Sequence, residues 1–221
     1  MPETVAIIGA GPLGRWLALA AARAGFRVLL EDVMPANLHH AQEWLQEELG
    51  AELLSGGSPS RSCISKAGPS TLHPSDEDLL PGTPVPLPSA QDDSALRVAF
   101  VSTIEDAVRE ADLAIDCVPD ELESKLEILW LLDRMAPPRT VLATPTTRLS
   151  ITDLANCTYR PEKCIAIAAE ASALTGGEGR EILLRTAART SRESVDLVER
   201  FWRRLGFLPV FEGEDGGQSQ S

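Results

Sequence analysis

The stretch Val5-Ala6-Ile7-Ile8-Gly9-Ala10-Gly11-Pro12-Leu13-Gly14 decides the fold of this chain. It opens with a short apolar run, passes through three glycines and leads into a segment of helical composition, Leu13 to Ala24. Gly25 is placed to end that helix, and a second apolar run, Val28 to Leu30, follows directly. The start of the chain therefore predicts a strand, a helix and a second strand.

The three glycines are spaced as GxGxxG, and their setting between a strand and a helix is typical of dinucleotide-binding proteins. Gly9 allows a tight turn, Gly11 lets the backbone approach a pyrophosphate, and Gly14 lets the helix pack closely on the strand. The helix N-terminus offers amide donors and a positive dipole end to phosphate. We therefore predict a dinucleotide site over Gly9, Ala10, Gly11, Pro12, Leu13 and Gly14.

A carboxylate supports this prediction, because Asp32 stands 18 residues after Gly14 at the end of the second predicted strand. An acidic residue there accepts a hydrogen bond from the adenosine ribose. Its charge repels the extra phosphate of NADP, and no arginine stands immediately beside it. We therefore expect Asp32 to bind the cofactor and NAD to be preferred over NADP. The alternative is a similar sheet whose glycine turn has lost its ligand.

Strand-like and helix-like patterns continue to alternate along the chain. Helices are predicted at 35–54, 102–111, 121–135 and 192–205, with Ser102 to Glu105 and Ser150 to Asp153 as capping boxes. Strands are predicted at 97–101, 113–118, 140–144, 164–169, 182–186 and 208–211. Alternation of this kind predicts an α/β fold, a Rossmann-like doubly wound and mostly parallel sheet with helices on both faces.

One segment differs in composition from the rest. Residues 55–94 contain nine Ser, seven Pro and four Gly. The segment therefore has too few apolar side chains to bury, and burial would not offset the entropy lost on ordering it. We interpret residues 1–215 as one NAD-binding domain interrupted by this flexible insertion, and 216–221 as a disordered tail. A substrate-binding flap that orders on contact is the alternative interpretation of the insertion.

Charge and cysteine content exclude several classes of partner and site. The formal charge of −13 disfavours nucleic acid and anionic membrane surfaces as partners. Cys63, Cys117, Cys157 and Cys164 form no CxxC pair and no zinc-type spacing, which favours idle thiols in a reducing cytoplasm. The N-terminus lacks a signal-peptide pattern, and no run reaches the length of a membrane span.

Three further motifs carry a family resemblance: Ala111 to Leu122 with Lys125, Leu142 to Ile151, and Arg160 to Lys163. Together with the glycine unit they resemble the N-terminal NAD-binding domain of the 3-hydroxyacyl-CoA dehydrogenase family. The resemblance places Asp120 and Lys125 on the nicotinamide side of the NAD site. It places Thr147 on the hydroxyl residue that binds the substrate oxygen. For Lys125 a solvated charge paired with Glu121 is the alternative, and for Thr147 a simple helix-entry turn.

The sequence differs from the family pattern at the position of the catalytic general base. The resemblance implies a His, oriented by a Glu, that takes the proton of the substrate hydroxyl. Ala168 stands at the His position, and Ile182 or Leu183 at the Glu position with Glu181 as a neighbour. We therefore assign no catalytic residue. Glu170, two residues from Ala168 on the same face of a strand, is a candidate replacement base against the alternative of a solvent-facing carboxylate.

The family continues into a helical domain that closes the acyl-CoA cleft and dimerises, whereas this chain stops at Ser221. Two functional hypotheses follow. The first is an NAD-dependent 3-hydroxyacyl-CoA dehydrogenase-like oxidoreductase of fatty acid metabolism, impaired or completed by a homo-oligomer or a separate helical partner chain, with an acyl-CoA type substrate. The second is a non-catalytic NAD-binding module such as a redox sensor or accessory subunit. A purely structural domain is a third alternative.

Overall fold

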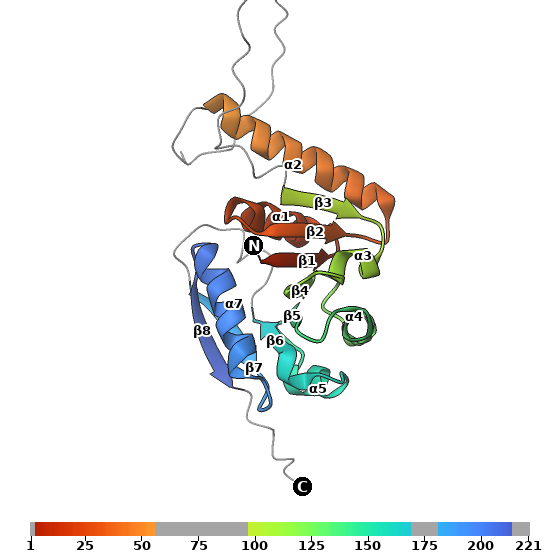
Figure 1. The fold of residues 1–221 in the computed structure, drawn as a ribbon, viewed down its shortest axis with the longest axis vertical. Helices are drawn as coiled ribbons and strands as arrows, with labels where there is room; N and C mark the ends of the chain where they lie inside the picture. The colour runs from red at the N-terminus through yellow and green to blue at the C-terminus, as the bar shows by residue number, and fades with distance from the viewer. Residues whose placement is uncertain (1–2, 56–96, 169–180, 214–221) are drawn as a thin grey trace, which may run out of the picture.

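The computed structural model describes residues 3–55, 97–168 and 181–213, and within them eight strands form one sheet (Figure 1). The strands are β1 (Thr4–Ile8), β2 (Arg27–Glu31), β3 (Val98–Val101), β4 (Leu113–Asp116), β5 (Val141–Pro145), β6 (Cys164–Ile167), β7 (Glu181–Thr186) and β8 (Leu208–Gly213). Their order in the sheet is β3-β2-β1-β4-β5-β6-β7-β8.

The sheet is mostly parallel. Strands β1 to β6 pair in parallel, β7 runs antiparallel to β6, and β8 is parallel to β7. The chain moves outward from β1 through β2 to β3, then crosses back to β4 on the other side of β1. The predicted doubly wound α/β fold is therefore confirmed, and the direction of winding reverses between β1 and β4. In open sheets of this kind the crevice at the carboxyl ends beside such a reversal receives ligands.

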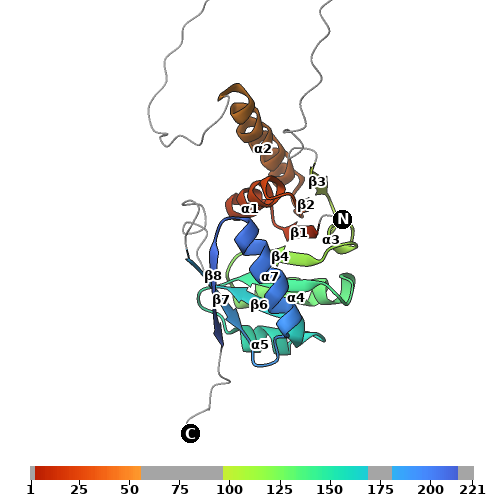
Figure 2. The same ribbon diagram turned by 60° about the vertical axis from the view of Figure 1, so that its left-hand side comes forward.

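Helices cover both faces of the sheet (Figures 1 and 2). They are α1 (Pro12–Arg23), α2 (Pro35–Ser55), α3 (Ile104–Val108), α4 (Leu122–Met135), α5 (Ile151–Asn156) and α7 (Arg192–Arg204), with the 3-10 turn η2 (Pro161–Lys163). Helices α1, α2 and α7 share one core with Val5 and Ile7 of β1, and α3, α4 and α5 share the other with Ala6 and Ile8. Alternate residues of one strand thus face opposite layers, as a sheet buried on both faces requires.

Helix α7 joins the last part of the chain to the first. Its Phe201 ring lies 5.2 Å from that of Phe26, and Trp202 and Phe207 meet edge to face at 5.3 Å. Phe201 and Trp202 are fully buried. Aromatic pairs at these distances add to the stabilisation from area burial, so α7 holds β7 and β8 in the same domain as β1.

Two local predictions are wrong in detail. The cap of α3 is Thr103 rather than Ser102, since the Thr103 hydroxyl oxygen accepts from the Asp106 amide at 3.1 Å. For α4, the spacing of Leu122, Leu126, Leu129 and Leu132 or Asp133 predicts one buried stripe. Asp133 is indeed buried, but Leu122 is 51% exposed and Lys125 is buried in addition. The second capping box is confirmed, because the Ser150 side chain accepts from the Asp153 amide at 3.2 Å.

Several predictions lie outside the described residues. These are the insertion beyond residue 55, the tail at 216–221, Cys63 and the candidate base Glu170. Among the described cysteines, Cys164 is buried, Cys117 is partly buried and Cys157 is exposed, and all three are free thiols.

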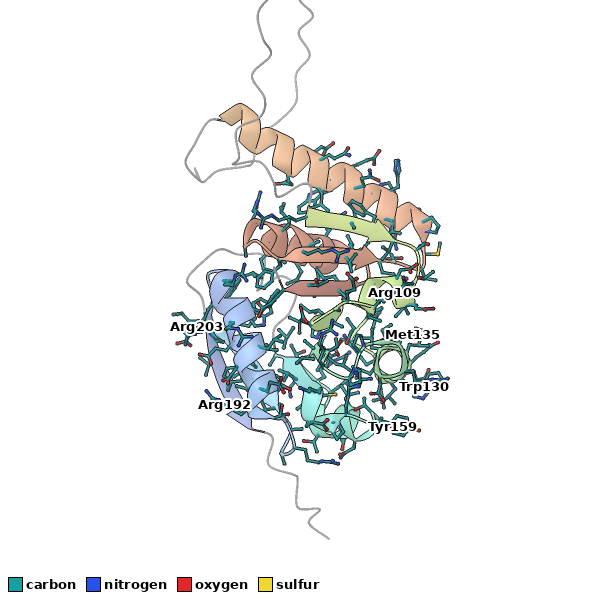
Figure 3. All side chains as sticks on the ribbon, viewed as in Figure 1. Arg109, Trp130, Met135, Tyr159, Arg192 and Arg203 are labelled. Atoms are coloured by element: carbon teal, nitrogen blue, oxygen red, sulfur yellow. The ribbon has the colours of Figure 1, made fainter. Side chains whose placement is uncertain are left out.

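The outer surface of α4 and the turn after α5 carry exposed apolar side chains. Figure 3 shows Trp130, Met135 and Tyr159 on that side of the molecule, and Tyr159 is 89% exposed. The guanidinium of Arg134 lies over the Trp130 ring, 4.6 Å from its centroid. Within the described residues no helix has the length and apolar character needed to cross a membrane.

Candidate functional site

A cavity of about 970 Å³ opens at the carboxyl ends of the parallel strands. Its wall comes from four connections, the glycine turn after β1, the end of β2 with the start of α2, the turn after β4, and the turn after β5. Ile104 of α3 and Ile128 of α4 complete it. These connections meet because parallel strands end at the same edge of a sheet. The cavity therefore occupies the crevice that the winding of the chain predicts, and its size is within the range of ligand pockets.

The glycine turn is built as the sequence predicts. Gly9 has φ +105°, a conformation that L residues with a side chain rarely adopt. A Cβ on Gly14 would lie 1.8 Å from the Gly9 carbonyl oxygen, so α1 and the turn touch backbone to backbone. A Cβ on Gly11, in contrast, would meet nothing within 4 Å. Gly9 and Gly14 are therefore required by the fold, whereas the bare surface at Gly11 faces the cavity.

Helix α1 presents its N-terminus to the cavity through Gly11, Pro12 and Leu13. Gly11 is the N-cap and supplies no side-chain hydrogen bond, and Pro12 occupies the first turn. The amides of that first turn have no intrahelical acceptor, and the helix dipole adds partial positive charge there. This arrangement is suited to an anionic group such as a diphosphate.

Asp32 lies in the cavity wall beside the glycine turn. Its Oδ2 accepts from the Ala10 amide at 2.8 Å, and its Oδ1 accepts from the Met34 amide at 2.8 Å and Asn37 Nδ2 at 3.0 Å. A carboxylate has about four acceptor positions, so three internal donors leave about one for a ligand hydroxyl. Asp32 therefore both anchors the turn and offers the acceptor that a ribose requires. Ala10, which is buried, contributes its amide to Asp32 rather than a surface to the cavity.

Glu31 adds a second carboxyl group to this end of the cavity. It is the last residue of β2, lines the cavity and is only 4% exposed. Burial, reinforced by the neighbouring charge of Asp32, raises the pKa of Glu31 to about 7. Glu31 is not among the site residues predicted from the sequence, although an acidic residue at the end of an apolar strand is a signal that points to it.

The opposite end of the cavity is lined by Asp120, Thr146, Thr147 and Arg148. The Asp120 Oδ2 atom accepts from the Thr147 amide at 3.3 Å, and Arg148 Nη2 donates to the Asp120 carbonyl at 2.8 Å. The Thr146 hydroxyl is already bonded to the Leu149 amide at 3.0 Å, which shapes the turn. The structure thus brings Asp120 and Thr147 together, as the resemblance implies, and it adds Arg148 beside them.

The two ends of the cavity are separated by the width of several strands. Asp32 follows β2 and Thr147 follows β5, which are three strand positions apart in the sheet. At about 4.8 Å per strand this amounts to about 14 Å, enough for an extended ligand to cross the glycine turn between them.

Lys125 does not line the cavity. It is fully buried on α4, and its Nζ donates to Asp116 Oδ1 at the end of β4. The alternative of a solvated charge paired with Glu121 is therefore wrong. Burial raises the pKa of Asp116, while the charge of Lys125 and the Thr144 hydroxyl act in the opposite direction. Since Cys117 follows Asp116 and lines the cavity, Lys125 supports the wall from beneath. Burial also raises the pKa of the Cys117 thiol.

The position assigned to the family base carries no ionisable group. Ala168 follows β6, and its amide donates to the Leu183 carbonyl at 2.8 Å. Ile182, one of the two candidates for the orienting position, is 2% exposed and packs in the core, and Glu181 is exposed at the start of β7. Glu170 stays a prediction because it lies outside the described residues.

The fold and this cavity define a dinucleotide-binding α/β domain of the Rossmann type. The family model described as 3-hydroxyacyl-CoA dehydrogenase, NAD binding domain, matches residues 4–63 and 87–169. The chain therefore belongs to the 3-hydroxyacyl-CoA dehydrogenase family through its NAD-binding domain. Membership of that domain family implies that it binds NAD(H).

Known relatives agree with this assignment. The chain is 27% identical over 165 residues to a probable 3-hydroxybutyryl-CoA dehydrogenase of Bacillus subtilis, covering 75% of this chain and 47% of that protein. It is 28% identical to 5-formyl-3-hydroxy-2-methylpyridine 4-carboxylate 5-dehydrogenase of Mesorhizobium japonicum, covering 97% and 59%. The crystal structure of (S)-3-hydroxybutyryl-CoA dehydrogenase from Ralstonia eutropha superposes with a TM-score of 0.74 at 22% identity, covering 98% and 65%. The chain thus spans about half the length of the curated relatives.

Proposed function

We propose that this chain binds NAD in preference to NADP, and that it takes part in hydride transfer with a 3-hydroxyacyl-CoA type substrate at the Thr147 end. The single observation that carries the proposal is the continuous cavity from Asp32, past the open backbone at Gly11, to Thr147.

The residues present suit the cofactor. The first turn of α1 would hold the diphosphate, and the free acceptor position of Asp32 would hold an adenosine ribose hydroxyl. A phosphate on that hydroxyl would meet the carboxylates of Asp32 and Glu31, and no cationic side chain bonds to either carboxylate among the described residues. This charge arrangement supports NAD over NADP. When bound, NAD supplies the hydride acceptor for oxidation of an alcohol.

The polar groups at the other end would orient a substrate. The Thr147 hydroxyl would donate to the substrate oxygen, and Asp120, fixed by the Thr147 amide, would stand beside the reacting end of the cofactor. The relatives named above act on hydroxyacyl thioesters and on a pyridine carboxylate, so the printed names support a dehydrogenase and leave the substrate to experiment.

We propose further that turnover by this chain is slow. A general base contributes about 10² to 10⁴ in rate, and Ala168 cannot remove a proton. A partner chain or second copy that closes the substrate side of the cavity would supply groups that the described residues lack.

A non-catalytic NAD-binding module is the second candidate function, and a specific observation favours it. The cofactor end is complete, with Gly11 open and Asp32 in place, whereas Ala168 stands where the resemblance places the base. A sensor or accessory subunit needs only the cofactor end of the cavity and no catalytic base.

Calorimetric titration of the full chain with NAD and NADP tests the cofactor, and absorbance of reduced cofactor with 3-hydroxybutyryl-CoA tests turnover. We expect NAD binding to be the tighter, with turnover far below that of a complete family member. Ala168→His, or added imidazole with the wild-type chain, should raise the rate if the rest of the site is competent. Absence of any rate gain would favour the non-catalytic module, and equal affinity for NAD and NADP would contradict the cofactor preference.

A further inference from the structure

Glu31 is a buried carboxyl group that the proposed function leaves without a role. It lines the cavity, is only 4% exposed and forms no side-chain hydrogen bond or ion pair within the described residues. Its backbone is fixed, because the Gly9 amide donates to the Glu31 carbonyl at 2.7 Å. Because the Glu31 side chain lines the cavity, its carboxyl group is available to a ligand there.

The surroundings of Glu31 are apolar apart from Asp32. In register it faces Ile8 of β1 and Val101 of β3, and the adjacent α3 contributes Ile104 to the cavity wall. The charged residues of α3, Glu105 and Asp106, and its C-cap Arg109 are exposed, and Arg109 pairs with Asp106. The negative charge of Asp32 is thus the charge that acts on Glu31.

The position of Glu31 in the cavity selects one part of the cofactor. In the proposed binding mode the diphosphate would lie over the start of α1 and a ribose at Asp32. The base would then lie beyond Asp32, where the wall is made by Glu31, Val33 and Ile104. Apolar residues there pack against the base faces. A carboxyl group in that wall instead requires a hydrogen-bond donor, and the donor that adenine offers is its exocyclic amino group.

From this geometry, and resting on the proposed NAD binding, we infer that Glu31 accepts a hydrogen bond from the exocyclic amino group of the adenine and so selects against bases that carry an oxygen there. Hypoxanthine is such a base. With an ionised Glu31, the carbonyl oxygen of hypoxanthine would face an acceptor at the position where the adenine amino group is a donor, and no hydrogen bond would form between the two oxygens. A protonated Glu31 could instead donate to that oxygen, so the selection depends on the ionised form.

The experiment compares NAD with nicotinamide hypoxanthine dinucleotide by calorimetric titration of the full chain at pH 6 and pH 8. At pH 8, above the Glu31 pKa of about 7, wild type should bind NAD at least about ten-fold more tightly than nicotinamide hypoxanthine dinucleotide. At pH 6 the ratio should fall. Glu31→Gln and Glu31→Leu should both bring the ratio close to one at either pH, because an amide can turn its donor to the oxygen and leucine makes no hydrogen bond.

The control is Glu105→Gln, which removes an exposed charge from α3 outside the cavity wall and should leave the ratio unchanged. Glu31→Gln has the same size as the native residue, so the test does not depend on whether Glu31→Leu folds. Equal affinity of wild type for the two dinucleotides, or a ratio that Glu31→Gln preserves, would overturn the inference while NAD binding stands. No binding of either dinucleotide to wild type would overturn the proposed function and the inference with it.

Discussion

Replacing Gly14 with alanine should distort and destabilise the glycine turn, and the structure gives the size of the effect. The added Cβ would lie 1.8 Å from the Gly9 carbonyl oxygen, whereas ordinary contact begins at 3.4 Å. The atoms must separate by about 1.6 Å, and the obstacle is backbone rather than a flexible side chain. Overpacking in a rigid site costs about 1 to 3 kcal/mol, and the intrinsic gain of alanine over glycine in a helix offsets about 0.5 to 1 kcal/mol.

We therefore expect Gly14→Ala to lower the free energy of unfolding by about 2 kcal/mol, measured by urea denaturation. Gly11→Ala is the matched control, since its Cβ would meet nothing within 4 Å and its φ of −66° suits alanine. Alanine restricts the unfolded chain more than glycine does, which stabilises the folded state, but alanine is a poorer N-cap residue than glycine. The two effects oppose each other, so the free energy of unfolding should change by less than about 0.5 kcal/mol.

The affinity for NAD, measured by titration, is a second property that tests these two variants. Gly11→Ala places a methyl group on the open surface of the turn and should weaken NAD binding about ten-fold or more while the protein stays fully folded. A Gly14→Ala protein as stable as wild type would refute the packing argument. A Gly11→Ala protein that binds NAD as tightly as wild type would show that the diphosphate does not lie on Gly11.

Three more predictions follow from the buried carboxylates. Asp32→Ala should weaken NAD binding about ten-fold and narrow the NAD over NADP preference in calorimetry, because it removes a charged acceptor; an unchanged ratio would count against its role. Lys125→Met should lower the free energy of unfolding by about 3 to 5 kcal/mol, because it leaves Asp116 buried and unpaired, and adding Asp116→Asn should recover much of this loss. A loss below about 1 kcal/mol would mean that the pair is dispensable. Since the folded pKa of Glu31 is raised from 4.5 to about 7, the free energy of unfolding should fall by about 3 kcal/mol between those pH values as pH rises. Glu31→Gln should flatten this slope in denaturation curves, and a rising slope in wild type would contradict the assignment.

The first strand, turn, helix and second strand were predictable because their signals are local. Gly9 adopts a positive φ, and Gly14 touches backbone, so the residue types report directly on the geometry. Local signals also explain why the predicted cap of α3 is wrong by one residue. Ser102 and Thr103 are both capping residues, each with an acid three positions later, and the sequence does not distinguish the two pairs.

The setting of Lys125 was not predictable, because its partner Asp116 reaches it only after β4 and α4 fold against each other. With Lys125 facing the core, Leu122 is left exposed on α4, whereas the spacing of the α4 leucines predicts that Leu122 is buried. Glu31 was missed for a related reason. Its chemistry follows from the apolar neighbours that β1, β3 and α3 place around it, which are distant in sequence.

The most direct measurement of the central claim is a crystal structure of the full chain grown with NAD. It should show the diphosphate over the first turn of α1 at Gly11 and Leu13, a ribose hydroxyl on Asp32, and the nicotinamide toward Thr147. A cofactor bound elsewhere, or a turn that stays closed to the diphosphate at saturating NAD, would contradict the account.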